Sequence, residues 1–257
     1  MVSIKTEEEI KLMRKSGRLL AEMMMKLVRV VKPGLFTIEL ESLANQFIIS
    51  CGAESAFKGF PSNKRGVSSF PSTLCVSINE EIVHGIPQKR QLKEGDIVSI
   101  DAGLKFKGYF SDMAITVPVG KIKKKAQHLL KVTKNALYQG ISRVKEGARL
   151  SDVSAAIEEY VYRHNCYVIK ELAGHGIGRS LHEEPNILNY GFPGKGIRLK
   201  KGMCLAIEPL VSLSTEKMKT KKDGWTIVTT DSSLAAHFEH TVLVTPQGAE
   251  ILTSMQE

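Results

Sequence analysis

Two aspartates, Asp101 and Asp112, are the first residues of this chain whose spacing indicates chemistry. They lie in two stretches of alternating apolar and polar residues, and a tight turn near Lys107 and Gly108 predicts that the stretches form a β-hairpin. In a hairpin whose loop has an even number of residues, the residue numbers of each cross-strand pair sum to an odd value. Both carboxylates then fall on one face, directly opposite or one diagonal step apart, with Cβ atoms within about 8 Å. Carboxylates this close repel each other unless a cation lies between them, but the pair alone also fits two solvated carboxylates on an exposed sheet face.

A second copy of the hairpin favours the cation site over the solvated alternative. The segments 92–101 and 112–120 each recur later in the chain, the second with one residue inserted. The copies place Glu208 and Glu239 where the first hairpin has its two aspartates. If the two halves fold alike and meet about a pseudo-twofold axis, four carboxylates come to one place. Buried charges must be paired or coordinated, so this arrangement requires metal.

His175 is the candidate nitrogen ligand. It lies in Gly174-His-Gly-Ile-Gly178, whose glycines allow the backbone to approach a ligand closely. A lone loop histidine is usually a surface residue, but the repeat supplies a counterpart, His84, which is followed by the same Gly-Ile pair. One neutral imidazole with four carboxylates suits two divalent, fairly hard ions such as Mn²⁺, Fe²⁺ or Co²⁺, and zinc is also compatible. Two such ions would lower the pKa of a bridging water toward about 7, so hydrolysis of a carbonyl compound is the expected reaction.

The elements before the hairpin are predicted to be helical. Thr6 and Glu9 form a capping box that begins a helix, which the segment 31–34 ends with Pro and Gly. A second helix is expected from Thr37 to about Ser50. Its inner face is expected to hold Leu40, Leu43, Phe47 and Ile48.

The second half repeats this order of elements. A long amphipathic helix is expected over 123–143, and another begins at Ser151. Each half is therefore helix, turn, helix and then antiparallel sheet, which predicts an α+β protein with its helices packed on one face of a twisted sheet. We expect a single catalytic domain over 1–257, with repeats at about 6–120 and 123–250.

Composition sets the class of protein. The 257 residues are 42% hydrophobic and 25% charged, as in ordinary globular proteins. A net charge of +9 favours attraction to polyanions such as ribosomal RNA. The basic clusters at 121–125 and 217–222 contain no interleaved aromatic residues, so sequence-specific nucleic-acid binding is not expected.

The cysteines and the apolar runs indicate the compartment. The four cysteines lie far apart and form no Cys-x-x-Cys pair, which excludes a zinc-ribbon site and suits reduced core thiols. No run approaches the ~18 apolar residues of a membrane span, and the first ten residues contain no apolar run typical of an export signal. We therefore expect a cytoplasmic protein that does not contact a membrane.

The motifs around these residues resemble type I methionine aminopeptidases, a metallopeptidase family with the pita-bread fold. Gly174-His-Gly-Ile-Gly178 and Phe238-Glu-His-Thr241 carry the resemblance, which extends over essentially the whole chain. The residues that match the five metal ligands are Asp101, Asp112, His175, Glu208 and Glu239.

The resemblance implies a role for each ligand. Asp112 and Glu239 would bridge two metal ions, Asp101 would complete one site, and His175 with Glu208 would complete the other. Glu208 would also move a proton to or from the bridging water.

The resemblance also implies the residues that contact substrate. His84 and His182 would hydrogen-bond the scissile amide and the developing oxyanion, where preorganised donors contribute most. The apolar wall for a methionine side chain would come from Phe70, Cys75, Leu181 and Trp225, joined by Phe57 or Phe60.

The implied function is removal of the N-terminal methionine from newly made proteins when the second residue is small, by attack of a metal-bridging hydroxide on the first peptide bond. The partners would be N-terminal peptides of nascent proteins and the ribosome, reached through the basic surface, and the protein would be a monomer. Two alternatives stay open: an Xaa-Pro aminopeptidase or prolidase on the same scaffold, and a non-catalytic pita-bread binding protein.

The chain departs from the family pattern in two places. It has Ala235-Ala-His237 where family members commonly carry Ser-Ala-Gln, which changes the hydrogen bonding expected beside Glu239. The loop between Phe57 and Phe70 is also longer than expected, which affects the alignment of the pocket aromatics.

Overall fold

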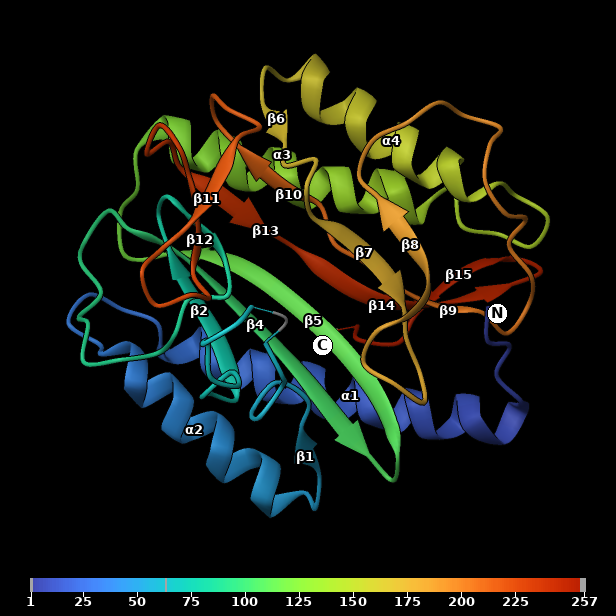
Figure 1. Cartoon of the computed structure of the whole chain (residues 1–257), viewed down its shortest axis with the longest axis horizontal. Coiled ribbons are helices and arrows are strands. Elements are labelled where there is room, and N and C mark those ends of the chain that lie inside the picture. Colours follow the sequence, from blue (N-terminus) through green and yellow to red (C-terminus); the bar gives the residue numbers. More distant parts are fainter. Residues whose placement is uncertain (1, 63, 255–257) are drawn as a thin grey trace.

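A curved antiparallel sheet is the centre of the computed structural model, which describes residues 2–62 and 64–254 (Figure 1). Seven of its strands follow the order β1-β4-β5-β14-β9-β7-β8, while β2 pairs with β4 and β15 with β14. In chain order these strands are β1 (Glu54–Ser55), β2 (Leu74–Ile78), β4 (Ile97–Phe106), β5 (Tyr109–Pro118), β7 (Ala173–Gly176), β8 (Glu183–Leu188), β9 (Cys204–Ile207), β14 (Glu239–Thr245) and β15 (Gly248–Ile251).

The hairpin of β4 and β5 has the register that the sequence predicts. Phe106 pairs with Tyr109, which leaves Lys107 and Gly108 as a two-residue turn with φ values of 48° and 87°. Both values lie in the left-handed region that such hairpin turns require. Asp101 pairs with Ala114, two residues beyond Asp112, so the two aspartates lie one diagonal step apart.

The second hairpin lies beside the first. Strand β14 pairs with β5 on one side and with β9 on the other. Ala114 faces Asp101 across β4 and Glu239 across β14, so one row of the sheet carries an acid from each half of the chain. The repeated segments therefore meet at the middle of the sheet.

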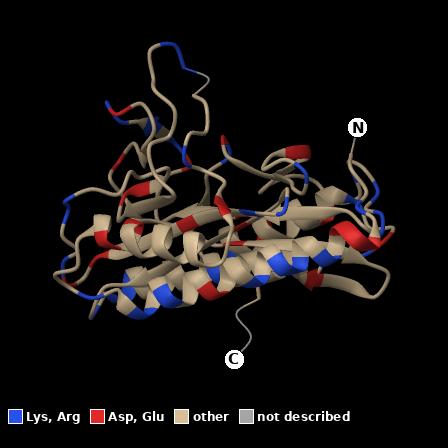
Figure 2. Cartoon of the chain, turned by 90° about the horizontal axis from the view of Figure 1, so that it is seen from below, with Lys and Arg blue, Asp and Glu red and all other residues tan. Residues whose placement is uncertain are grey.

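Four helices cover one side of this sheet, as predicted, and the long loops rise from the other side (Figure 2). They are α1 (Glu7–Val30), α2 (Thr37–Ser50), α3 (Lys124–Ile141) and α4 (Leu150–Arg163). The predicted capping box is present, because Thr6 Oγ1 accepts from the Glu9 amide and a Glu9 carboxylate oxygen accepts from the Thr6 amide.

One prediction for α2 is wrong. The buried stripe of this helix follows Leu40, Ala44 and Ile48, which are four residues apart and lie one above the other. Leu43 falls to one side of that stripe and is 39% exposed. An apolar stripe on a helix is more than one residue wide. Whether a residue at its edge is buried therefore depends on which elements pack beside it.

Two small three-stranded sheets have strand ladders separate from that of the main sheet. The first has the order β13-β10-β6 and the second the order β11-β12-β3. Their strands are β3 (Glu81–Val83), β6 (Tyr167–Val168), β10 (Leu210–Ser212), β11 (Met218–Thr220), β12 (Ile227–Thr229) and β13 (Ala235–His237). Within the described ranges, none of the helices has the length and apolarity needed to cross a membrane.

Candidate metal centre

The five predicted ligands line one cavity of about 500 Å³. Asp101 and Asp112 project from the neighbouring strands β4 and β5, and His175 projects from β7. Glu208 directly follows β9, and Glu239 is the first residue of β14, the strand that pairs with β9. The ligands thus come from five consecutive strands of the sheet, in the order β4-β5-β14-β9-β7, although up to 138 positions separate them in the chain (Asp101 to Glu239).

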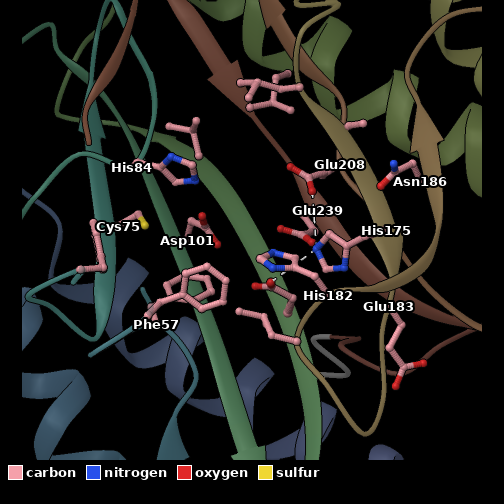
Figure 3. Close-up of a pocket in the computed structure, with 18 of the residues that line it drawn as sticks. Phe57, Cys75, His84, Asp101, His175, His182, Glu183, Asn186, Glu208 and Glu239 are labelled. Carbon is pink, nitrogen blue, oxygen red and sulfur yellow. Dashed lines mark ion pairs between the residues drawn. The ribbon is translucent and has the colours of Figure 1, made fainter. Parts of the chain in front are cut away.

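The imidazole of His175 faces the acids through Nε2. Its Nδ1 lies 2.9 Å from the carbonyl oxygen of Gly176, which orients the ring and assigns the proton to Nδ1. Nε2 then lies 3.7 Å from Glu208 Oε1 and 4.0 Å from Asp112 Oδ2. Figure 3 shows Glu208, Glu239 and His175 pointing toward one another, with Asp101 on the side of Cys75 and His84.

The carboxylates are buried, which excludes the solvated alternative. Asp101 is 6% exposed, Asp112 4% and Glu239 2%. Burial, with a smaller contribution from repulsion by Glu208, raises the pKa of Asp101 to about 7 against the opposing effect of His237. Burial, and then repulsion between the acids, raises the pKa of Asp112 and of Glu239 well above the ordinary value.

Two carboxylate oxygens of the centre, Asp101 Oδ1 and Glu239 Oε1, are buried with no hydrogen-bond partner in the described part of the chain. Buried polar atoms are nearly always paired. These carboxylate oxygens repel each other, lack hydrogen-bond donors and lie around an imidazole nitrogen. Together they are the kind of ligand atoms that a divalent cation needs. The residues present therefore fit the metal that the sequence predicts.

The distances divide the centre into two groups of three ligand atoms. Among the described residues, one group is Asp112, His175 and Glu239, and the other is Glu208, His237 and Glu239. The atoms of each group lie within 4.8 Å of one another, and Glu239 belongs to both groups. Asp101 lines the same cavity but joins neither group, so its assignment to one ion stays a prediction.

His237 belongs to one of these groups, although the sequence does not predict it to be a metal ligand. The replacement of the family's Ser-Ala-Gln by Ala235-Ala-His237 predicts only a change in hydrogen bonding near Glu239. A signal for its position is present in the sequence, because His237 precedes Glu239 by two, the spacing at which residues of an extended chain share a face.

Two further histidines, His84 and His182, line the cavity without belonging to either group. Burial lowers the pKa of each to about 4, so both imidazoles are neutral near pH 7. His84 follows β3 with a φ of 60°, a left-handed backbone conformation that is uncommon for residues other than glycine. The His182 ring lies edge-on to the His175 ring, with centroids 4.4 Å apart. Each can offer an N–H group to a ligand in the cavity.

The predicted apolar wall lines the same cavity. Phe70 and Trp225 meet edge to face with ring centroids 5.1 Å apart, and the Trp225 indole donates to the Ser68 carbonyl oxygen at 3.0 Å. Burial, followed by repulsion from Asp101, raises the pKa of the Cys75 thiol well above its usual value, so this residue is an uncharged apolar wall. The other predicted lining residues are Phe57, Phe60 and Leu181, and those that sequence reasoning missed include Val83, Leu172, Asn186 and Leu210.

Comparison with known proteins shows the family to which this chain belongs. The model of metallopeptidase family M24 matches residues 11–246. Methionine aminopeptidase 1 of Bacillus subtilis is 47% identical over 253 residues, covering 98% of this chain and 99% of that protein. The methionine aminopeptidase of Clostridium perfringens is 44% identical, with the same coverage of 98% and 99%.

Comparison with solved structures gives the same family likeness. The crystal structure of methionine aminopeptidase from Thermotoga maritima has a TM-score of 0.95 at 44% identity, covering 99% of this chain and 100% of that chain. The prolidase from Pyrococcus furiosus has a TM-score of 0.77 at 22% identity, covering 99% of this chain and 66% of that chain. The second likeness concerns the fold alone, and together they confirm the predicted α+β pita-bread fold.

Proposed function

The chain belongs to metallopeptidase family M24, and from this premise we propose that it removes the N-terminal methionine of newly made proteins when the second residue is small. The observation that carries the proposal is the full-length identity of 47% to a methionine aminopeptidase. A buried cluster of carboxylates and imidazole, open to a cavity with an apolar wall, supports it. The alternatives of a proline-specific peptidase and of a non-catalytic binding protein lack such support.

We propose that the cavity holds two divalent ions, Mn²⁺, Fe²⁺ or Co²⁺, with zinc also compatible. As the resemblance implies, Asp112 and Glu239 would hold both ions, Asp101 would complete one site, and His175 with Glu208 would complete the other. Among the described residues Glu239 belongs to both groups of close ligand atoms, and Glu208 lies 3.7 Å from His175 and 3.5 Å from His237, so it can serve beside either imidazole. When bound, such ions supply Lewis-acid chemistry: they polarise the carbonyl and make water acidic enough to act as a nucleophile near neutral pH.

The protein's own residues then place the substrate. The acidic cluster attracts the α-ammonium group of a peptide, so the first peptide bond lies at the metal centre. Neutral His84 and His182 donate hydrogen bonds to the scissile amide and to the oxygen on which negative charge develops. Glu208, which lines the cavity, accepts and returns the proton of the attacking water.

The first side chain must occupy the cavity beside this centre. Phe70, Cys75, Leu181 and Trp225 offer it aromatic rings, a thiol and a leucine. Methionine is unbranched and polarizable, and sulfur–aromatic contacts contribute about 0.3–1.5 kcal/mol. Lost methylenes alone discriminate by about 1–3 kcal/mol, so methionine should be preferred over shorter apolar residues by one to two decades.

A peptide panel tests the proposed function. Metal-loaded protein is incubated with Met-Ala-Ser, Met-Lys-Ser and Ala-Pro-Ser, and the products are measured by mass spectrometry. We expect fast release of methionine from Met-Ala-Ser, slow release from Met-Lys-Ser, loss of turnover after chelation and recovery on addition of Mn²⁺ or Co²⁺. Preferential cleavage of Ala-Pro-Ser would overturn the substrate, and full turnover in metal-free protein would overturn the mechanism.

We further propose the setting in which this activity operates. The chain acts as a single catalytic domain and a monomer in the cytoplasm, without contact with a membrane. Its net charge of +9 favours association with the ribosome, where the N-termini of nascent proteins appear.

A further inference from the structure

His237 is the one imidazole of the centre that no predicted role uses. It ends β13, pairs in register with Leu210 of β10, and is 1% exposed. Neither ring nitrogen has a hydrogen-bond partner among residues 2–62 and 64–254. A buried imidazole without a partner for either nitrogen is costly unless another group satisfies it.

The ring is aimed at the carboxylates. His237 Nε2 lies 3.5 Å from Glu208 Oε2 and 3.7 Å from Glu239 Oε2. Both distances exceed the 2.7–3.2 Å typical of N–H···O hydrogen bonds. Ligand atoms that each lie about 2.1 Å from one ion are separated by no more than about 4.2 Å. The spacing therefore suits coordination of a shared cation better than direct hydrogen bonding.

Glu208 lies between two imidazoles. Its Oε1 faces His175 Nε2 at 3.7 Å, and its Oε2 faces His237 Nε2 at 3.5 Å. Each imidazole also belongs to a different one of the two ligand groups, which share Glu239. The two imidazoles therefore face opposite oxygens of one carboxylate, that of Glu208.

The backbone holds His237 in this place. The Thr116 hydroxyl accepts from the His237 amide at 2.8 Å and donates to the His237 carbonyl oxygen at 2.8 Å. Ser99 Oγ lies 2.8 Å from the same hydroxyl. These hydrogen bonds fix the His237 backbone to β5 and, through Ser99, to β4, without requiring an ion.

We propose that His237 is an additional metal ligand, which coordinates through Nε2 together with Glu208 and Glu239. The inference rests on the proposed metal function of the same cavity and adds a second nitrogen to its donor set. Nitrogen ligands favour Co²⁺, Ni²⁺ and Zn²⁺ over Mn²⁺, for which oxygen ligands are better suited. This chain should therefore discriminate against Mn²⁺ more strongly than a variant in which an amide replaces the imidazole.

Paramagnetic proton NMR of the Co²⁺-loaded protein tests the proposal. Each coordinated imidazole keeps a proton on its other nitrogen, and this proton gives a strongly shifted signal that disappears in D₂O. We expect two such signals, from His175 and His237, in the unmodified protein. His237→Gln should remove one of them, whereas His84→Gln, which alters a cavity histidine outside the ligand groups, should retain both.

Metal affinity gives a second readout that does not depend on turnover. Loss of groups that only orient a ligand costs about 10–100-fold in affinity. Loss of a ligand should therefore weaken Co²⁺ binding to His237→Gln by about 10²-fold or more, with a smaller change for Mn²⁺, in chelator competition assays. Near-ultraviolet circular dichroism checks that the variant is folded.

The outcomes separate the two proposals. Two exchangeable signals in the unmodified protein, one of which His237→Gln removes, support His237 as a ligand. A single exchangeable signal in the unmodified protein, or equal metal affinity in His237→Gln, overturns the ligand role and leaves the metallopeptidase function intact. Absence of any Co²⁺ binding to the unmodified protein would instead overturn the proposed function.

Discussion

At the scale of single residues, His84 is held as a neutral donor by its surroundings. Burial lowers its pKa to about 4, and Trp225 packs against it with ring centroids 6.2 Å apart. Because it belongs to neither group of close ligand atoms, its proposed role is to contact substrate. A residue of this kind affects the transition state more than the composition of the metal centre.

We expect His84→Ala to retain bound metal and to lose about 10²-fold in kcat, comparable to the removal of one preorganised donor. His84→Gln keeps an N–H donor and should recover part of the rate. Elemental mass spectrometry measures the bound metal, and kcat on Met-Ala-Ser measures the loss of rate. Loss of metal in His84→Ala would show that this residue is a ligand, contrary to its assigned role.

At the scale of elements, the start of α1 is bound to the loop between β7 and β8, which carries His182. Glu9 accepts from the Thr6 amide and binds the Arg179 guanidinium through both carboxylate oxygens, at 2.6 and 2.7 Å. Burial raises the pKa of Glu9, but the Thr6 amide, Arg179 and Tyr109 outweigh it and lower the pKa to about 2 from an ordinary value of 4.5.

This lowered pKa predicts a pH-dependent contribution to stability. Glu9 stabilises the fold fully above pH 4.5, and the contribution disappears as the pH falls through about 2. Since half of the Arg179 side chain is exposed, we expect about 1–2 kcal/mol rather than the full value of the shift. Urea unfolding of Glu9→Gln should show this deficit at pH 7 and none near pH 2.

A matched substitution controls the measurement. Glu7→Gln removes an exposed carboxylate from the same turn of α1 and should change the free energy of unfolding by less than about 0.5 kcal/mol. A Glu9→Gln deficit that persisted unchanged at pH 2 would refute the electrostatic explanation.

Helix α1 also makes a close contact that only glycine allows. A Cβ at Gly17 would overlap the carbonyl oxygen of Leu252 and lie 2.7 Å from its carbonyl carbon. At Gly140 of α3 the nearest atom would be the Ile157 Cγ1, at 2.8 Å. The first obstacle is backbone, whereas the second is the movable part of a side chain.

Alanine substitutions at these two positions should therefore differ. Alanine gains about 1 kcal/mol in helix propensity, and overpacking costs about 1–3 kcal/mol. We expect Gly17→Ala to lower the free energy of unfolding by about 1–2 kcal/mol and Gly140→Ala to change it by less, measured as urea midpoints at constant m-value. Equal effects of the two substitutions would contradict a rigid contact at Leu252.

At the scale of the whole molecule, the helix layer and the cavity lie on opposite sides of the sheet. Figure 2 shows Lys and Arg distributed along the helices of that layer. Exposed basic residues of α1 include Lys11, Arg14, Lys15, Arg18, Lys26 and Arg29. A polyanion bound to this side would leave the cavity open to a peptide.

The proposed ribosome association predicts a salt-dependent interaction through that layer. The double substitution Lys15→Glu and Arg18→Glu should weaken cosedimentation with purified ribosomes by about tenfold or more and reduce the salt dependence. Lys217→Glu with Lys222→Glu, outside the helix layer, is the matched control and should retain binding. If the control pair abolished binding and the α1 pair did not, the contact surface would be the other basic cluster.

The sequence by itself determined the local parts of this protein. Alternation of apolar residues and an even turn placed Asp101 and Asp112 on one face of a hairpin, as the observed register confirms. The capping box at Thr6 gave the start of α1 to the residue. Both are interactions between positions close in sequence, where backbone geometry leaves few choices.

The repeat predicts that the four distant acids come together, but only the tertiary structure decided how they meet and which other residues join them. Pairing of β5 with β14 put the acids of the two halves in one row, and β13 brought His237 to Glu208. Packing against neighbouring elements also left Leu43 exposed, although it lies beside the buried stripe of its helix. Period and propensity assign a side chain to a face, but its distance from a residue on another strand depends on strand order and on the curvature of the sheet. Those follow from how the whole core packs.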